Sequence, residues 1–193
     1  PRRRDGRGGV LFVGPHKPYL AYVADVLPSL GEEGVQTCTV RDLVPDGESM
    51  PPETDPEVAR LKSSAEMVGA IEPAVRLYEE LPTEGMTVET PYADLWLSPD
   101  DWAEAFGAAD PGIAHNEARD DIWEALVAIL LDQVDPDADV PTDLLRRSLA
   151  QSAALTTAFD KAWTAIDPYD LVGDLWSVPA YLRMCAPWLS PEE

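Results

Sequence analysis

The sequence predicts an α/β unit followed by a mainly helical module that contains one small β-hairpin. Two short apolar runs, Val10 to Val13 and Val35 to Val40, flank a segment with helical periodicity. Beyond the prolines near residue 50, apolar residues recur every three or four positions. One stretch, Met86 to Leu97, alternates instead. These three observations favour a strand–helix–strand unit and then helices interrupted by a hairpin.

The run Val10 to Val13 is too short for a helix and lies between Gly9 and Gly14. Such a run is typical of a strand buried on both faces of a parallel sheet. A helical face with apolar residues three or four apart follows, made of Leu20, Val23, Leu27 and Leu30. With Val35 to Val40 as a second strand, the order is that of a parallel strand–helix–strand unit.

Prolines and acidic residues dominate residues 42–56, which predicts a loop and a domain boundary. We place the boundary between residues 54 and 55, giving units 1–54 and 55–193. Residues 57–81 have a helical pattern, which Pro73 should kink or split.

The rest of the second unit is predicted from local patterns. Ser98 before Pro99 predicts a helix start, and the broad apolar face of residues 115–134 predicts a central helix. Asp167 and Pro168 predict the start of a short amphipathic segment. Further helices are expected over residues 143–151, 153–166 and 178–189.

The chain is strongly acidic, with 14 Lys and Arg against 36 Asp and Glu and a formal net charge of −22. Such a surface repels phosphate backbones, so nucleic acid should bind only weakly or indirectly. It suits a basic protein partner, a metal site, or simple solvation. The two cysteines, Cys38 and Cys185, lie in apolar segments without metal-ligand spacing, so buried, reduced thiols are expected. No apolar stretch is long enough to span a membrane.

The candidate chemistry lies in an acidic segment on a proline-containing break between two helices. Its five carboxylates fall within twelve residues: Asp132, Asp135, Asp137, Asp139 and Asp143. Carboxylates are oxygen donors suited to Mg²⁺ or Ca²⁺. A calcium loop would need Gly and Glu where Val140 and Arg146 stand, so no preformed metal site is expected. The alternative is a solvated linker between helices.

Other candidate residues have a structural explanation. His115 is expected to cap the central helix, and no Ser–His–Asp spacing indicates a triad. Asp120 and Glu124 fit a solvated helix face. Four tryptophans that would be able to stack on bases are expected in the core instead, namely Trp96, Trp102, Trp123 and Trp163.

The segments GPHKPYLAYVADVLPSLGE and HNEARD, with the closing APWLSPEE, resemble HelD-type proteins, which are helicase-like ATPases related to the UvrD/Rep helicases. The resemblance covers nearly the whole chain. It implies part of a RecA-like domain in residues 1–54 and a family-specific helical insertion in 55–193. It also places Gly14, Pro15 and His16 at the position of a motif that contacts single-stranded DNA.

The resemblance implies a partner, the core of bacterial RNA polymerase. HelD-type proteins insert a loop into the polymerase channel toward its active-site magnesium, and the segment 135–142 would be that loop. The resemblance implies that the chain displaces nucleic acid and helps to release or recycle the polymerase, and that it protects the polymerase against rifamycins. The alternative is an accessory insertion of a true UvrD/Rep-like DNA helicase that modulates DNA binding.

The nucleotide-binding motifs of helicase-like ATPases are not found in this sequence. Neither GxxxxGK(S/T) nor a strand ending in an acidic pair occurs. The basic start, PRRRDGR, leads directly into a strand, which suggests a piece of a longer chain. We therefore expect no cofactor in this fragment, with ATP and Mg²⁺ bound by a cytoplasmic parent protein that is the ATPase.

Overall fold

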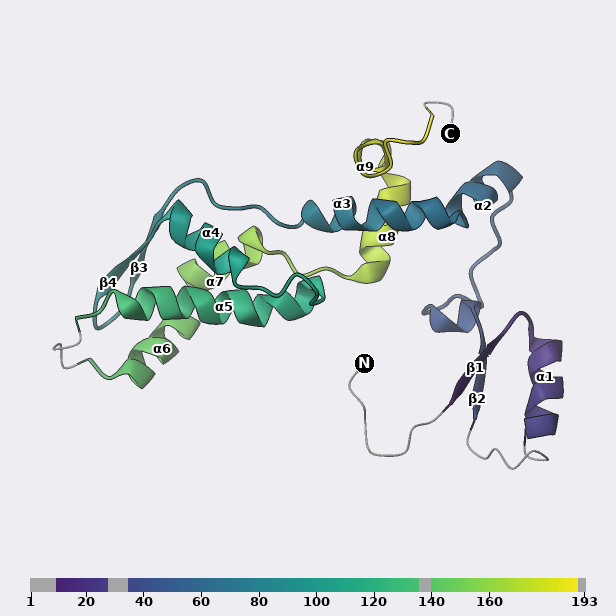
Figure 1. Ribbon diagram of the computed structural model, residues 1–193, viewed down its shortest axis with the longest axis horizontal. Coiled ribbons are helices and arrows are strands. Elements are labelled where there is room, and N and C mark those ends of the chain that lie inside the picture. The colour runs from purple at the N-terminus through teal and green to yellow at the C-terminus, as the bar shows by residue number, and fades with distance from the viewer. Residues whose placement is uncertain (1–9, 28–34, 136–139, 191–193) are drawn as a thin grey trace. The chain divides into compact units, whose positions relative to one another are not determined.

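The computed structural model describes residues 10–27, 35–135 and 140–190. The chain forms two compact units, residues 1–56 and 57–193, so the division falls two residues after the expected boundary. The described residues are mixed α/β and mostly helical, with two separate two-stranded sheets (Figure 1). Within these ranges, no helix combines the length and apolar character needed to cross a bilayer.

The first unit contains the predicted strand–helix–strand arrangement. Its elements are β1 (Leu11–Gly14), α1 (Lys17–Val26) and β2 (Gln36–Thr39). The two strands are parallel, with Leu11 opposite Gln36 and Gly14 opposite Thr39. Figure 1 shows α1 beside the two strands it connects. The prediction of a parallel unit is therefore confirmed.

The prediction that β1 is buried on both faces is wrong. In the part of the first unit that the structure describes, α1 is the one helix that packs on the sheet, where Leu20 is buried and the rings of Phe12 and Tyr19 lie 6.2 Å apart. The side chains of Leu11 and Val13 are 51% and 43% exposed on the other face. An apolar run indicates a strand, but it does not reveal how many layers cover that strand in the described part of the chain.

The predicted loop follows β2. After a short 3₁₀ helix, η2 (Arg41–Leu43), the chain runs through turns and extended segments to Asp55. The second unit then starts with α2 (Pro56–Lys62), the 3₁₀ helix η3 (Ala65–Ala70) and α3 (Ile71–Arg76).

The helical pattern over residues 57–81 does form helical segments, but the break predicted at Pro73 lies elsewhere. The chain leaves α2 at Ser63, and Ser64 caps η3 by accepting a hydrogen bond from the N–H of Glu66 at 3.2 Å. The break precedes Pro73, which lies at the third position of α3. In the first turn of a helix a missing N–H costs little, so the proline neither kinks nor ends this helix.

The predicted hairpin and the helices around it form one core. The elements are β3 (Met86–Glu89), β4 (Asp94–Leu97), α4 (Pro99–Gly107), α5 (His115–Asp132), α6 (Thr142–Gln151) and α7 (Ala153–Ala162). Strands β3 and β4 are antiparallel, with Val88 opposite Leu95. Ser98 and Asp101 cap α4 reciprocally, as the Ser–Pro pattern predicts. Helix α7 ends at Ala162 instead of the predicted Ile166, because the next residues pair with other segments.

We call this the hairpin core. It joins the inner face of the hairpin to one face of α5 and to the facing sides of α4, α6 and α7. Its fully buried large side chains are Val88, Leu97, Trp102, Ile122, Leu126, Val127, Leu130, Leu145, Leu149 and Leu155. The 3.6-residue period of α5 and the two-residue period of the hairpin thus converge on one interior.

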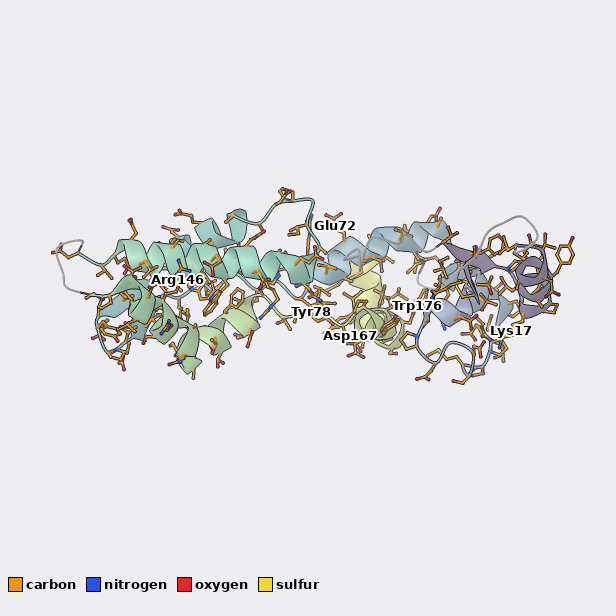
Figure 2. The ribbon with its side chains drawn as sticks, turned by 90° about the horizontal axis from the view of Figure 1, so that it is seen from below. Lys17, Glu72, Tyr78, Arg146, Asp167 and Trp176 are labelled. Carbon is orange, nitrogen blue, oxygen red and sulfur yellow. The ribbon has the colours of Figure 1, made fainter. Side chains whose placement is uncertain are left out.

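A second core, the C-terminal core, contains η3, α3, α8 (Pro168–Ser177) and α9 (Pro179–Cys185). Asp167 caps α8 by accepting hydrogen bonds from two backbone N–H groups at 2.8 and 3.3 Å, as predicted (Figure 2). Helix α9 ends four residues before the predicted Leu189. Burial raises the pKa of the Cys185 thiol, whereas Cys38 is only half-buried, so the expectation of two buried thiols is wrong for Cys38.

Candidate functional site

The segment that resembles a DNA-contacting motif lies at the carboxyl end of β1. Gly14 ends the strand, and His16 is the N-cap of α1, with its Nδ1 accepting a hydrogen bond from the N–H of Tyr19 at 3.2 Å. Pro15 and His16 are exposed. A ring nitrogen that caps a helix is engaged with its own backbone, so this segment has a structural role within the first unit.

Charged groups from the following loop close over this edge of the sheet. The N–H and the hydroxyl of Thr39 donate to Asp42 Oδ2 at 2.7 and 2.9 Å, and Lys17 pairs with Glu48. The Thr39 backbone N–H, followed by hydrogen bonding with Glu48 and the Thr39 hydroxyl, lowers the pKa of Asp42. The hydrogen bond and the charge of Glu48 raise the pKa of Lys17.

An open pocket of about 350 Å³ lies at the same edge. Its lining residues are Pro15, His16, Lys17, Thr39, Val40, Arg41 and Glu48. The lining contains two basic side chains, Lys17 and Arg41, and Lys17 is paired with the acidic Glu48. The pocket therefore presents basic and acidic groups together beside Pro15 and His16.

The acidic segment joins α5 to α6 at one end of the hairpin core. Asp132 is the last residue of α5, Asp135 follows it, and Asp143 lies in the first turn of α6. The side chains of all three residues are exposed. Asp137 and Asp139 lie outside the described residues.

The base of the acidic segment is anchored in the fold. Val134 and Val140, which lie at its two ends, are partly buried against the hairpin core. The Gln133 side chain adds two hydrogen bonds to the backbone of Trp96 on β4, accepting from its N–H at 3.0 Å and donating to its carbonyl at 2.7 Å. The carboxylates are therefore presented to solvent from a base fixed by packing.

Among the residues described, no group of three or more His, Cys, Asp or Glu side chains converges as a metal site would require. His115 also differs from its expected role. The N-cap of α5 is Ala114, and the His115 side chain makes no cap hydrogen bond. Its ring instead stacks on Trp163, with centroids 4.6 Å apart and an interplanar angle of 10°.

His115 belongs to a junction between distant segments. Its Nε2 donates to the Thr164 carbonyl at 2.9 Å, and its Nδ1 lies 3.2 Å from Glu79 Oε1. The backbones pair at the same point, because the N–H of Thr164 donates to the Tyr78 carbonyl at 2.9 Å (Figure 2). Burial and then the charge of Asp174 raise the pKa of Tyr78. The junction links the chain after α3 to the chain after α7.

Two further polar side chains of α5 contact neighbouring helices and segments. Arg119 donates to the Trp163 carbonyl and to Asp160 Oδ1, the latter at 2.5 Å. Glu124 accepts from Arg146 of α6 at 2.5 Å (Figure 2), and Asp120 is exposed, so the prediction of a solvated face fits both acidic residues.

Of the four tryptophans expected in the core, one differs. Trp102 and Trp163 are buried and Trp123 is partly buried, but the side chain of Trp96 is 53% exposed. The alternation of the hairpin contains the signal for this exposure, because Trp96 lies between the inward-facing Leu95 and Leu97. Because tryptophan is hydrophobic, burial was expected at this position in spite of the alternation.

No protein-family model matches this chain, and no curated protein matches it. These comparisons assign no family, so any function must be argued from the residues and the fold.

Proposed function

We propose that this chain is the polymerase-binding part of a HelD-like motor, in which the acidic segment between α5 and α6 enters the nucleic-acid channel of bacterial RNA polymerase. One observation carries the proposal. The segment between α5 and α6 carries exposed carboxylates at Asp132, Asp135 and Asp143. Next to them, Val134 and Val140 pack against the hairpin core. Exposed carboxylates beside a packed base suit a channel that is basic enough to hold nucleic acid.

The overall charge supports the same function. A net charge of −22 disfavours binding to phosphates and favours association with a basic protein surface. In the channel, the carboxylates would mimic phosphates, contribute oxygens near the polymerase magnesium and displace nucleic acid. Release or recycling of the polymerase, and protection from rifamycins, would follow in the parent protein.

The proposal also covers the first unit. We infer that β1, α1 and β2 form part of a RecA-like sheet, and the parallel order of the strands supports this. The ATP site and its Mg²⁺ would be supplied by a cytoplasmic parent protein, so the chain by itself would not hydrolyse ATP. ATP hydrolysis by the purified chain would overturn this part of the proposal. The activity would have to persist after contaminants are removed and to disappear when the chain is unfolded.

The alternative is an insertion in a true DNA helicase, and binding experiments separate the two. The chain should be retained by immobilised core RNA polymerase at low salt. It should bind single-stranded DNA only weakly. No retention on polymerase, together with DNA binding that falls steeply with salt, would favour the helicase alternative.

The acidic segment is tested with a matched pair of variants. Replacing Asp135, Asp137 and Asp139 together by Asn should weaken displacement of nucleic acid from the polymerase. The control replaces three exposed acidic residues elsewhere, Asp120→Asn, Asp121→Asn and Glu104→Gln, and removes the same charge. Equal displacement by both triple variants would show that net charge, and not this segment, is responsible.

A further inference from the structure

The outward side of the β-hairpin carries an unusual set of side chains. Four exposed residues share this side, and we call them the hairpin face: Thr87, Glu89, Asp94 and Trp96. The residues that alternate with them, such as Val88 and Leu95, are buried in the hairpin core. The core therefore fixes which side of the hairpin meets solvent.

The two acidic residues of the hairpin face are direct cross-strand partners. Glu89 lies opposite Asp94 in the antiparallel register. Like charges in that position repel and destabilise a hairpin. In the ranges that the structure describes, no Lys, Arg or His side chain forms an ion pair with either one. Within residues 10–27, 35–135 and 140–190, therefore, no basic side chain pairs with these two carboxylates to offset the repulsion.

Beside this pair lies the exposed indole of Trp96. Its ring covers Gly85, where an added Cβ would be 2.3 Å from ring atom Cζ2. The two hydrogen bonds from Gln133 hold the backbone of the same residue. An aromatic residue whose ring packs on Gly85 and whose backbone is held by Gln133, but which is still 53% exposed, has little conformational entropy left to lose on binding.

We propose that the hairpin face binds an arginine-bearing segment of a protein partner. The guanidinium group stacks on the ring of Trp96 and donates hydrogen bonds to Glu89 and Asp94. Arginine fits because it combines a planar stacking surface with several N–H donors. The carboxylates repel phosphates, so the partner is a protein segment and not a nucleic acid. This inference does not require the polymerase, because it rests on the hairpin alone.

The experiment follows the Trp96 indole N–H in the ¹H–¹⁵N NMR spectrum of the full chain, with the peak assigned by a Trp96→Phe variant. The probes are a short peptide with two arginines and the same peptide with citrulline in their place. The arginine peptide should shift the Trp96 peak in a saturable way, and the citrulline peptide should not.

A matched pair of variants separates this face from the general acidity of the chain. Glu89→Gln with Asp94→Asn should weaken binding of the arginine peptide about fivefold, the effect of losing a charged contact beside an aromatic ring. Asp120→Asn with Asp121→Asn, which removes the same charge from α5, should change it less than about twofold.

Three results would overturn the inference. The first is an equal loss in both pairs of variants, and the second is a larger Trp96 shift with single-stranded DNA than with the arginine peptide. The third is a Trp96 shift that depends on protein concentration alone, which would identify a second copy of the chain as the occupant. Loss of polymerase retention with an intact arginine response would refute the proposed function and leave this inference standing.

Discussion

At the scale of single residues, Asp42 shows how an exposed side chain organises the first unit. It accepts hydrogen bonds from the N–H and the hydroxyl of Thr39, the last residue of β2. These bonds end the strand and turn the chain into η2. Their strength depends on the charge of the carboxylate, since an ionised oxygen is the stronger acceptor.

The pH dependence of this contact can be predicted. The Thr39 N–H and the other hydrogen bonds lower the pKa of Asp42 from 3.8, so the folded state binds its proton less readily than the unfolded state. Asp42 therefore stabilises the fold above pH 3.8, and this contribution is lost as the pH falls through the lower, folded-state pKa. The amide chemical shift of Thr39 should titrate with a midpoint below 3.8. Asp42→Asn should abolish that titration, and a wild-type midpoint at or above 3.8 would contradict the assignment.

His115 allows a second prediction at this scale. His115→Phe keeps a ring to stack on Trp163 but loses the hydrogen bond to the Thr164 carbonyl and the contact with Glu79. Loss of these contacts, which are part-buried at Glu79 and exposed at Thr164, should lower the free energy of unfolding by about 0.5–1.5 kcal/mol. Urea unfolding followed by tryptophan fluorescence measures the loss. Asp121→Asn, an exposed change on the same helix, serves as the control and should have almost no effect.

At the scale of elements, local patterns predicted most of the secondary structure. The apolar run of β1, the alternation of β3 and β4, and the Ser98 cap of α4 each depend on neighbouring residues and each formed as expected. The partners of His115 are Glu79 and Thr164, which lie 36 and 49 positions away in the sequence. No local pattern indicates contacts at such distances. Hydrophobicity alone also misplaced Trp96, because burial is set by the side of the strand.

Pro73 tests the interpretation of α3. Because it lies in the first turn, Pro73→Ala should change the free energy of unfolding by less than about 1 kcal/mol. Arg76→Pro, in the last turn of the same helix, should cost about 3 kcal/mol, since the new ring displaces a helical hydrogen bond. Thermal unfolding followed by far-UV circular dichroism compares the two variants. A large loss from Pro73→Ala would show that the proline defines the helix boundary after all.

At the scale of the whole molecule, the two units differ in how much core they contain. The described residues of the second unit form two buried cores, the hairpin core and the C-terminal core. The junction that contains His115, Trp163 and Glu79 links them. The described residues of the first unit form one α-helix on a two-stranded sheet, with Leu11 and Val13 exposed on the other face. Small sheets of this kind have little independent stability.

We therefore expect residues 57–193, expressed alone, to keep their helical circular dichroism and to unfold cooperatively. Residues 1–56 alone should show little cooperative unfolding, because two strands and one helix bury too little apolar surface. Urea titration of both fragments and of the full chain provides the measurement. Loss of the cooperative transition in residues 57–193 would mean that the helical unit depends on the first 56 residues.

The unequal surroundings of the two thiols have a practical use. Cys185 is buried, and its raised pKa keeps it protonated at neutral pH, whereas Cys38 is half-buried on β2. A maleimide dye added at neutral pH should therefore attach at Cys38, and each molecule would carry one fluorophore on its N-terminal unit. With an acceptor dye on a bound peptide or polymerase, that label would report by energy transfer how near the N-terminal unit comes to each ligand.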